Sequence, residues 1–326
     1  MLATAILGGD RRALARAITL MESTRRDHRD AANELLEQLM PHTGGAIRLG
    51  ISGSPGVGKS TFIEALGNHV IDQGHRVAVL TVDPSSAISG GSILGDKTRM
   101  ETLARRDEAF IRPSPSGTTL GGVTRRSHEI LLLCEAAGFD VIIVETVGVG
   151  QSETRVADMT DMFILLLLPG GGDQLQGIKR GIMELADLIL INKADDDTEV
   201  LAGQAAIEFR NALQLLRPRS PDWKVEVQTC SARDNKGIAE AWEVVERYQE
   251  TVAASGLLEA RRAEQARSWM WSEVRESLMA DLTGDPGVRE HIAELEDAAS
   301  DGRVSAAAAA ERLLRIYLSD KDEKHD

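Results

Sequence analysis

The segment GSPGVGKST at residues 53–61 combines three glycines with a lysine and three hydroxyl side chains, at the spacing G-x-x-x-x-G-K-[ST]. A loop of this composition curls so that backbone N–H groups point at phosphate oxygens, beside the N-terminus of the next helix. There Lys59 neutralises the β and γ phosphates and the Ser60 hydroxyl ligates Mg²⁺. The apolar run before the motif and the helical pattern after it favour a phosphate-binding loop over a structural turn. The predicted nucleotide-binding residues of this loop are Gly53, Ser54, Pro55, Gly56, Val57, Gly58, Lys59, Ser60 and Thr61.

A second group of residues predicts which base is bound. The tetrapeptide NKAD at 192–195 follows a buried apolar run, and Asp195 can accept hydrogen bonds from guanine N1–H and its 2-amino group. Adenine lacks both donors, so it would leave a buried carboxylate unpaired. So short a match also fits a helix cap, but a phosphate loop ahead of it and TCSA at 229–232 after it favour guanine. We expect backbone N–H groups near Ser231 and Ala232 to reach guanine O6. The predicted base-binding residues are Asn192, Lys193, Asp195, Ser231, Ala232 and Arg233.

Carboxylates that could complete a Mg²⁺ site follow other apolar runs. Asp83 comes directly after one run, Glu145 ends another, and Asp96 lies in a Gly-rich stretch between them. Each also fits a turn or a helix cap, Asp96 most easily. Glu145 stands where aspartate is commoner, and its extra methylene suits contact with the metal through water. The predicted metal ligands are Ser60, Asp83, Asp96 and Glu145.

Composition excludes several other classes of function. A net charge of −14 and only 3% aromatic residues argue against a nucleic-acid binder. The longest apolar run, at 162–169, is far too short to span a bilayer, so we expect no membrane association. The N-terminus carries no export or import signal, and the two distant cysteines form no metal or redox pattern. These features predict a cytoplasmic protein.

The elements that must position these residues alternate between β-rich and helical segments. This alternation predicts an α/β fold with a mostly parallel sheet and helices on both faces, which binds ligands at the carboxyl ends of its strands. We expect three regions: a helical extension at 1–44, the nucleotide-binding domain at 45–250, and a helical region at 251–326. The last could pack against its own chain or form an oligomer surface. The predicted strands lie at 47–52, 75–82, 139–145, 162–169, 188–192 and 224–232.

Five longer blocks of sequence resemble the MeaB/ArgK G proteins, the family of the methylmalonic aciduria type A protein. The resemblance runs from about residue 10 to at least residue 245. These blocks are far more distinctive than the phosphate loop alone, which thousands of NTPases share. They are RALARAITLMES, DPSS…SGGSILGDKTRM, RPSPSGTTLGGVTRR, FDVIIVETVGVGQSE and LLPGGGDQLQGIKRGIMELADLILINKAD.

The resemblance implies a P-loop G domain of the signal-recognition and MinD-like class, binding GTP or GDP with Mg²⁺. It also implies a function, because family members are GTPases that chaperone adenosylcobalamin-dependent acyl-CoA mutases, most typically methylmalonyl-CoA mutase. They gate cofactor loading and protect or reactivate the mutase. The C-terminal helices would then form a homodimer. Residues 170–181 would be an additional switch loop facing the mutase, with Lys179 as its main charged residue and Asp173 and Gln174 as partners.

One position departs from the usual switch motif of a GTPase. The residue after the switch glycine, Gly148, is commonly a glutamine that orients the attacking water, but here it is Val149, and Gln151 follows two positions later. An apolar side chain cannot orient water, so we expect slow intrinsic hydrolysis. The group that orients the attacking water would then be Gln151, Lys179 or a residue of a partner protein. The predicted catalytic residues are Lys59, Glu145, Gln151 and Lys179.

Two other readings stay open at this point. A maturation GTPase for another metalloenzyme, similar to HypB and UreG, would usually carry a cluster of His and Cys ligands, and the scattered histidines and cysteines here give none. A kinase of the older ArgK type would need a phosphoacceptor site and would not need to read guanine.

Overall fold

The computed structural model describes residues 1–23, 25–82, 100–112, 120–146, 152–170, 180–216, 219–220 and 222–322. The chain forms two compact units, Met1–Gln265 and Ala266–Asp326. The first unit contains the three N-terminal helices together with the sheet. The region boundaries expected at about residues 44 and 250 stay predictions. Within the described residues, no helix is both long and apolar enough to cross a membrane.

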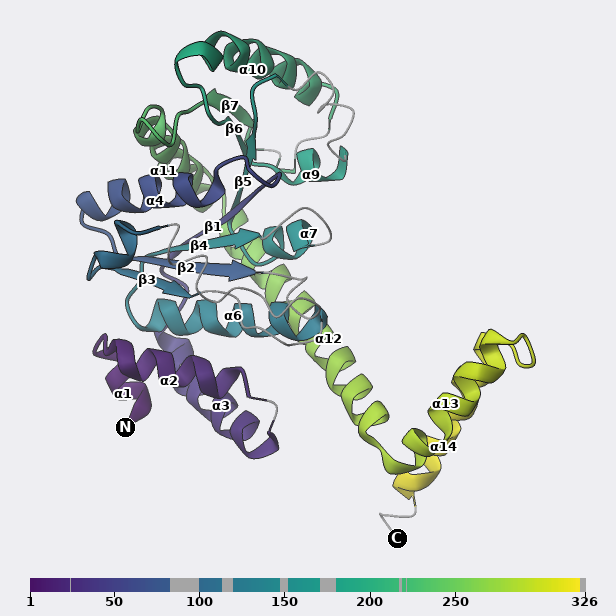
Figure 1. Cartoon of the computed structure of the whole chain (residues 1–326). Helices are drawn as coiled ribbons and strands as arrows, with labels where there is room; N and C mark the ends of the chain where they lie inside the picture. Colours follow the sequence, from purple (N-terminus) through teal and green to yellow (C-terminus); the bar gives the residue numbers. More distant parts are fainter. Residues whose placement is uncertain are drawn as a thin grey trace. The chain divides into compact units, whose positions relative to one another are not determined.

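A seven-stranded sheet in the order β3-β2-β4-β1-β5-β6-β7 forms the centre of the first unit (Figure 1). All six neighbouring strand pairs are parallel, which confirms the α/β class expected from the sequence. Strands buried on both faces read as continuous apolar runs, and β2, β4, β5 and β6 are buried along their whole length. The strands are β1 (Ile47–Gly53), β2 (Val77–Val82), β3 (Ala109–Arg112), β4 (Val141–Thr146), β5 (Met162–Leu167), β6 (Leu188–Ile191) and β7 (Glu226–Thr229).

Helices cover both faces of this sheet. On one face α4 (Lys59–Asp72) and α11 (Ile238–Ala254) pack over Leu49 and Ile51 of β1 in a single apolar core. The opposite face is covered by α6 (Leu120–Ala136) and α7 (Ser152–Ala157). Gly50 of β1, which lies between Leu49 and Ile51 and so points the other way, faces α7. Figure 1 shows α4 and α11 on one side of the sheet and α6 on the other.

The remaining helices of the first unit extend these layers. The N-terminal helices pack on α6, on the side away from the sheet (Figure 1). Near the other edge, α10 packs against β7 and α9 packs against α7. These helices are α1 (Leu2–Leu7), α2 (Arg11–Met21), α3 (Arg26–Leu39), α9 (Arg180–Leu185) and α10 (Glu199–Leu213), with short 3₁₀ turns η1 (Met40–His42), η3 (Leu103–Arg105) and η4 (Asp196–Thr198).

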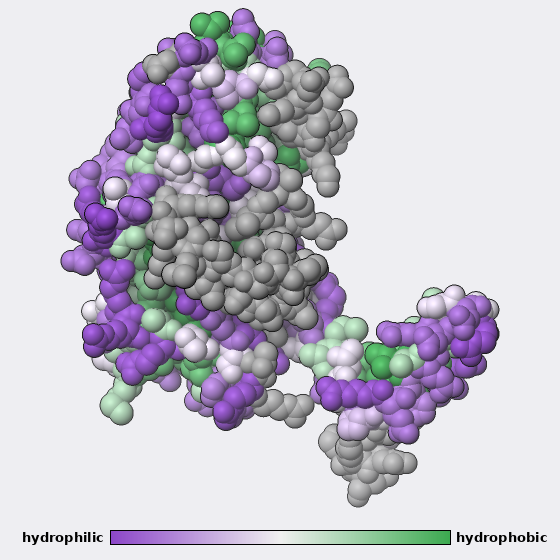
Figure 2. Space-filling view, in the orientation of Figure 1, coloured by the Kyte–Doolittle hydropathy of each residue, from purple (hydrophilic) through white to green (hydrophobic). Residues whose placement is uncertain are grey.

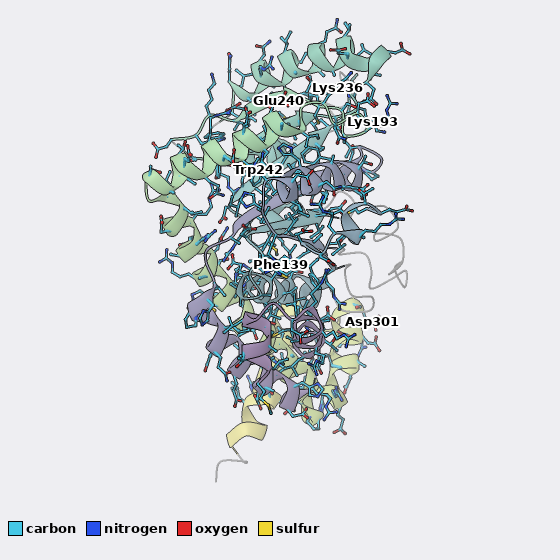
Figure 3. All side chains as sticks on the ribbon, turned by 90° about the vertical axis from the view of Figure 1, so that its left-hand side faces the viewer. Phe139, Lys193, Lys236, Glu240, Trp242 and Asp301 are labelled. Carbon is cyan, nitrogen blue, oxygen red and sulfur yellow. The ribbon has the colours of Figure 1, made fainter. Side chains whose placement is uncertain are left out.

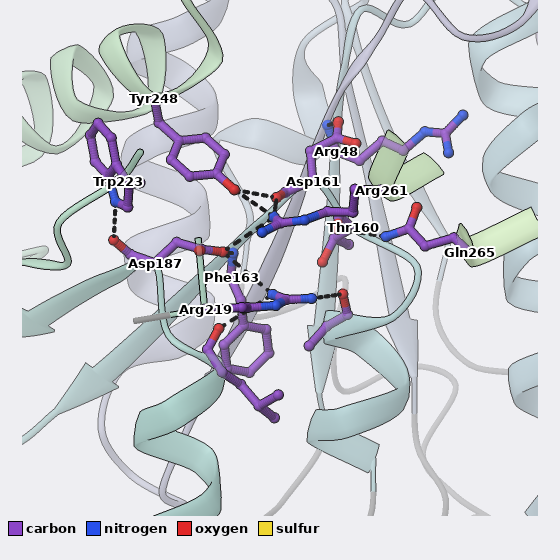
Figure 4. A network of polar contacts seen from close by, with 12 residues as sticks. Arg48, Thr160, Asp161, Phe163, Asp187, Arg219, Trp223, Tyr248, Arg261 and Gln265 are labelled. Atoms are coloured by element: carbon purple, nitrogen blue, oxygen red, sulfur yellow. Dashed lines mark hydrogen bonds and ion pairs between the residues drawn. The ribbon is translucent and has the colours of Figure 1, made fainter. Parts of the chain in front are cut away.

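A buried polar network lies at the amino edge of the sheet, where β1, β5 and β6 begin (Figure 4). Asp161, directly before β5, is fully buried and accepts from the backbone N–H of Arg48 at 2.9 Å. It also accepts from Nε and Nη2 of Arg262, at 2.8 and 2.7 Å. The Arg48 side chain in turn donates to Glu135 at 2.8 and 3.0 Å. Buried charges of this kind are stable because each one is paired and hydrogen-bonded.

Arg262 belongs to α12 (Leu257–Gly284), the helix that begins in the first unit. Gln265 of the same helix donates to the Thr160 carbonyl at 2.9 Å. Arg262 also donates to the Ala46 carbonyl at 2.7 Å, just ahead of β1. The first turns of α12 are therefore fastened to the amino edge of the sheet.

The second unit consists of the rest of α12, together with α13 (Pro286–Ser300) and α14 (Ala306–Asp322). The Asp285 side chain caps α13 by accepting from Gly287 N and Val288 N, and Tyr317 donates to Asp281 at 2.6 Å. Figure 2 shows hydrophobic surface on these helices. Their exposed large apolar side chains are Met270, Trp271, Val274, Leu278, Met279, Leu314 and Leu318.

Candidate functional site

The phosphate loop occupies the turn between β1, which ends at Gly53, and α4, which begins at Lys59. This is the strand–loop–helix context that the motif requires. Lys59 is 9% exposed, and its Nζ donates to the Gly53 carbonyl at 2.8 Å. The ammonium group is therefore held over the loop, at the N-terminus of a helix where anions are stabilised.

Gly58 lets the loop meet the predicted base-binding segment. Its φ is +94°, and a Cβ at this position would lie 2.8 Å from Nδ2 of Asn192. A side chain at position 58 would therefore strain the backbone and also push Asn192 away. Gly58 therefore also makes room for Asn192, which the sequence pattern alone does not show.

Asn192, directly after β6, joins three segments at the carboxyl edge. Its buried Nδ2 donates to the Val57 carbonyl of the phosphate loop at 2.8 Å. Its Oδ1 accepts from Ala232 N at 3.2 Å and from the Cys230 thiol at 3.5 Å, both after β7. The thiol contact was missed from the sequence, where Cys230 seemed to carry no chemistry. Burial, and secondarily the charge of Asp195, raises the pKa of Cys230 to about 12, so it stays a protonated donor.

The two predicted base-binding segments lie side by side; Figure 3 labels Lys193 of the first and Lys236, whose backbone bonds Ser231 of the second. Ala194 N donates to the Cys230 carbonyl at 3.0 Å, which ties the segments together. Asp195 Oδ1 accepts from the Ser231 hydroxyl, and Oδ2 lies 3.7 Å from Nη1 of Arg233. A carboxylate held in this way keeps a fixed direction for a base with two donors.

The backbone N–H groups expected to reach guanine O6 are engaged within the chain. Ser231 N donates to the Lys236 carbonyl at 2.9 Å, and Ala232 N donates to Asn192. A guanine O6 bound at this place would share or replace one of these bonds. The contact to O6 therefore stays a prediction.

The Mg²⁺ side of the site is described in part. The Ser60 hydroxyl lies 3.4 Å from Oε1 of Glu145, which is 4% exposed at the end of β4. A hydroxyl and a carboxylate oxygen converging beside the phosphate loop are suitable groups for Mg²⁺. Thr146 donates to the Ser52 hydroxyl at 2.9 Å and so holds the ends of β4 and β1 together. Within the part of the chain that the structure describes, no three His, Cys, Asp or Glu residues are grouped as a metal site.

Several predicted residues lie outside the described residues. They are the metal-ligand candidates Asp83 and Asp96, the switch residues Gly148 and Gln151 with Val149 between them, and the partner-facing Asp173, Gln174 and Lys179. The described candidates are brought together at one edge: the phosphate loop, Glu145, NKAD and the Ser231–Arg233 segment. Their roles toward a nucleotide stay predictions.

Comparison with known proteins identifies relatives that are named as GTPases. Residues 14–286 match the family described as methylmalonyl Co-A mutase-associated GTPase MeaB. A protein named putative GTPase from Caulobacter vibrioides is 56% identical over 96% of this chain and 95% of its own length. The mouse protein named methylmalonic aciduria type A homolog, mitochondrial, is 49% identical over 97% of this chain and 79% of its own.

Solved structures give the same result. A crystal structure described as LAO/AO transport system kinase is 39% identical to this chain and superimposes with a TM-score of 0.77. It covers 96% of this chain, and this chain covers 95% of it.

Proposed function

Because the chain belongs to the MeaB family of P-loop GTPases, we propose that it is the GTP-hydrolysing chaperone of an adenosylcobalamin-dependent acyl-CoA mutase. Methylmalonyl-CoA mutase is the expected partner, since the family description names it. GTP binding and hydrolysis would gate cofactor loading and protect or reactivate the mutase. The observation that carries the GTPase part is the docking of Asn192 on the Val57 carbonyl, which joins a base-binding segment to the phosphate loop.

The residues of this chain would act as follows. Lys59 would move from the Gly53 carbonyl to the β and γ phosphates and stabilise the charge that develops on transfer. Asp195, held by Ser231, would accept from guanine and reject adenine. Ser60 and Glu145 would hold Mg²⁺, directly or through water, and the bound metal would supply neutralisation of phosphate charge.

Hydrolysis by the isolated protein would be slow, because Val149 cannot orient water. A partner that completes the site would accelerate it, and electrostatic help supplied in trans is worth about 10³ to 10⁵ in rate in known GTPases. Within this chain, Gln151 and Lys179 are the candidates for orienting the attacking water. Such a protein would act through which nucleotide it holds, GTP or GDP, and the rate of hydrolysis would set how long the GTP-bound state lasts.

We further propose that the protein acts as a cytoplasmic homodimer formed by the second unit. The support is the set of exposed apolar side chains on α12 and α14, among them Trp271 and Leu318. Apolar side chains clustered in this way on a small helical unit are usual in a protein interface. Sedimentation of the wild type against Trp271→Glu tests it, and a wild type that stays monomeric at micromolar concentration contradicts it.

The deciding experiment is single-turnover GTP hydrolysis with and without methylmalonyl-CoA mutase. We expect the mutase to raise the rate at least about tenfold, and Lys179→Ala to lose that rise. Lys224→Ala, a lysine ahead of β7, is the matched control and should respond like the wild type. No response to the mutase in the wild type would reject the partner and leave the GTPase activity standing.

A kinase activity is the second candidate, because the similar crystal structure is described as a transport system kinase. That activity would transfer the γ-phosphoryl group to a protein hydroxyl instead of water. Competition by ATP at the GTP site, together with label transfer from the γ-phosphate to protein, would support it. Failure of ATP to displace GTP, as Asp195 predicts, counts against it.

A further inference from the structure

Two short helices follow the predicted switch segments. The helix α7 begins at Ser152, directly after the segment with Gly148 and Gln151, and α9 begins at Arg180, directly after the segment with Lys179. Each helix has only six residues. Helices this short are marginal by themselves, so their positions depend on tertiary contacts. Whatever holds these two helices therefore also sets the geometry from which the switch segments depart.

One side chain holds the C-terminal ends of both helices. Arg219 Nη2 donates to the carbonyl of Ala157, the last residue of α7, at 3.0 Å. Its Nη1 lies 3.4 Å from the carbonyl of Leu185, the last residue of α9. The last carbonyls of a helix have no partner within the helix and carry partial negative charge, so a guanidinium is favourable there. Arg219 satisfies this need in two helices at once (Figure 4).

The same arginine is tied to the amino edge of the sheet. Its Nη1 is 3.5 Å from Oδ2 of Asp187, which stands directly before β6 and is 1% exposed. That oxygen also accepts from Phe163 N at 2.9 Å and lies 3.7 Å from Nη1 of Arg261 on α12. Burial raises the pKa of Asp187, while the two arginines oppose this rise. Asp187 thus connects Arg219 to the first turns of α12.

The helix α7 also lies unusually close to the strand that carries the phosphate loop. A Cβ on Gly50 of β1 would lie 2.7 Å from Oγ1 of Thr160 and 2.9 Å from Cγ1 of Val156. The gap between α7 and β1 therefore has no room for a methyl group. A displacement of α7 is resisted by β1 on one side and by Arg219 at its C-terminus.

We propose that Arg219 is a positioning residue for GTP hydrolysis, which holds α7 and α9 in register with each other and, through Asp187, with α12. Neither helix can shift along the sheet without lengthening a bond to Arg219 or carrying the other helix with it. Arg219 has no contact with the base-binding or phosphate-binding residues among the bonds of the described chain, so it would act on the rate of hydrolysis and not on the affinity for nucleotide. This inference rests on the GTPase activity and is independent of the mutase.

The test compares Arg219→Gln with Arg210→Gln in the full-length protein without mutase. Arg210 is the matched control, because it donates to the carbonyl of Val227 on the edge strand β7 instead, at 2.8 and 3.3 Å. Loss of two bonds to helix carbonyls should lower single-turnover hydrolysis roughly tenfold in Arg219→Gln. The rate of Arg210→Gln and the affinity of both variants for GDP should stay within about twofold of the wild type.

Trp223 offers a second readout within the network. Its Nε1 donates to the Asp187 carbonyl at 2.8 Å, and its ring packs edge-on against Tyr248 at 5.0 Å. The part of the tryptophan emission that disappears in Trp223→Phe reports on this place. In the wild type it should differ between the complexes with GDP and with a non-hydrolysable GTP analogue, and in Arg219→Gln this difference should disappear.

The outcomes separate positioning from a structural role. An equal fall in hydrolysis in both variants, or a loss of GDP affinity as large as the loss of rate, would overturn the proposal. So would a Trp223 signal that keeps its full nucleotide dependence in Arg219→Gln. If Arg219→Gln does not fold, Arg261→Gln provides the same test from the other side of Asp187, and a nucleotide-dependent Trp223 signal of wild-type size there would reject the relay.

Discussion

Charged groups are bonded differently at the two edges of the sheet: tightly around Asp161 at the amino edge, and by longer or local contacts at the carboxyl edge. At the amino edge Asp161 is fully buried and is bonded at 2.7 to 2.9 Å by Arg48 N and by two nitrogens of Arg262. At the carboxyl edge the Ser60 hydroxyl and Glu145 are 3.4 Å apart, near the limit for a hydrogen bond. There Lys59 folds back on a carbonyl of its own loop. A phosphate or a cation can replace such contacts at small cost, whereas the short bonds that surround Asp161 leave no room for exchange.

This contrast separates stability from function within one sheet. Buried pairs that are fully satisfied fix the positions of the strands, and removing one partner leaves an uncompensated charge. Contacts that are long or internal to a glycine-rich loop keep polar groups available for a ligand. Substitutions of Asp161 at the amino edge and of the ligand-facing groups at the carboxyl edge should therefore affect different quantities, and the following tests examine this.

A large effect on stability is expected from Asp161→Asn at the amino edge. The variant leaves the part-buried Arg262 without its carboxylate and puts an amide in a fully buried position, so it should lose about 3 kcal/mol of unfolding free energy. Urea denaturation measures this loss. The matched control Asp301→Asn breaks an exposed pair with Arg303 and should leave the midpoint unchanged, while GTP hydrolysis per folded molecule stays near the wild type in both. Equal destabilisation by the two variants would contradict the contrast between the edges.

Lys59→Ala at the carboxyl edge should show the reverse behaviour. Removing the cation that stabilises developing phosphate charge should lower single-turnover hydrolysis by about 10²- to 10³-fold at saturating GTP. The described bonds of Lys59 go to carbonyls of its own loop, so the unfolding midpoint of the nucleotide-free protein should change little. A variant that unfolds as easily as Asp161→Asn would show that the lysine is part of the structural core.

Asp195→Asn should change which base is bound. The amide can no longer accept from both guanine donors, so the affinity for GDP should fall about 100-fold. The amide NH₂ can donate to the 2-carbonyl of xanthine, so the affinity for XDP should rise relative to that for GDP. Calorimetry with both nucleotides measures this, with Asp234→Asn as a control that removes a neighbouring carboxylate bonded to Arg233. Unchanged preference in Asp195→Asn would exclude this residue from base recognition.

The last test concerns pH and His128 on α6. Burial, with a smaller contribution from the positive charge of Arg48, lowers the pKa of His128 to about 4. The unfolded chain, with an ordinary pKa near 6.5, therefore binds a proton before the folded chain does as pH falls. This stabilising contribution is fully present above about pH 6.5 and is lost as pH falls toward 4. We expect the unfolding free energy of the wild type to fall more steeply across this range than that of His128→Gln, and parallel curves would refute the assignment.

Much of the carboxyl edge could be predicted from the sequence. The glycine-rich loop and NKAD can be identified because their chemistry depends on residues that are close in sequence. Their proximity follows because parallel strands bring their carboxyl ends to the same edge. Six apolar runs gave strands, but β3 was missed, because AFIR at 109–112 is only four residues long and such a run lacks a readable period.

The amino edge could not be predicted in the same way. Asp161 and Arg262 are about a hundred residues apart, and nothing in the sequence pairs one aspartate with one arginine among many. The same applies to Arg219, whose partners, the carbonyls of Leu185 and Ala157, lie 34 and 62 residues away in the sequence. The contact of Cys230 with Asn192 also depends on rotamers, which no local pattern encodes.

The clamp that Arg262 makes has a consequence for the order in which the protein is completed during synthesis. This arginine donates to the carbonyls of Gly44 and Ala46, just ahead of β1, although it leaves the ribosome more than two hundred residues later. A nascent chain that ends before α12 carries Asp161 with its backbone partner but without this guanidinium. The central strand of the sheet therefore waits for the start of the last long helix, and the domain becomes fully stable only when nearly the whole chain has been made.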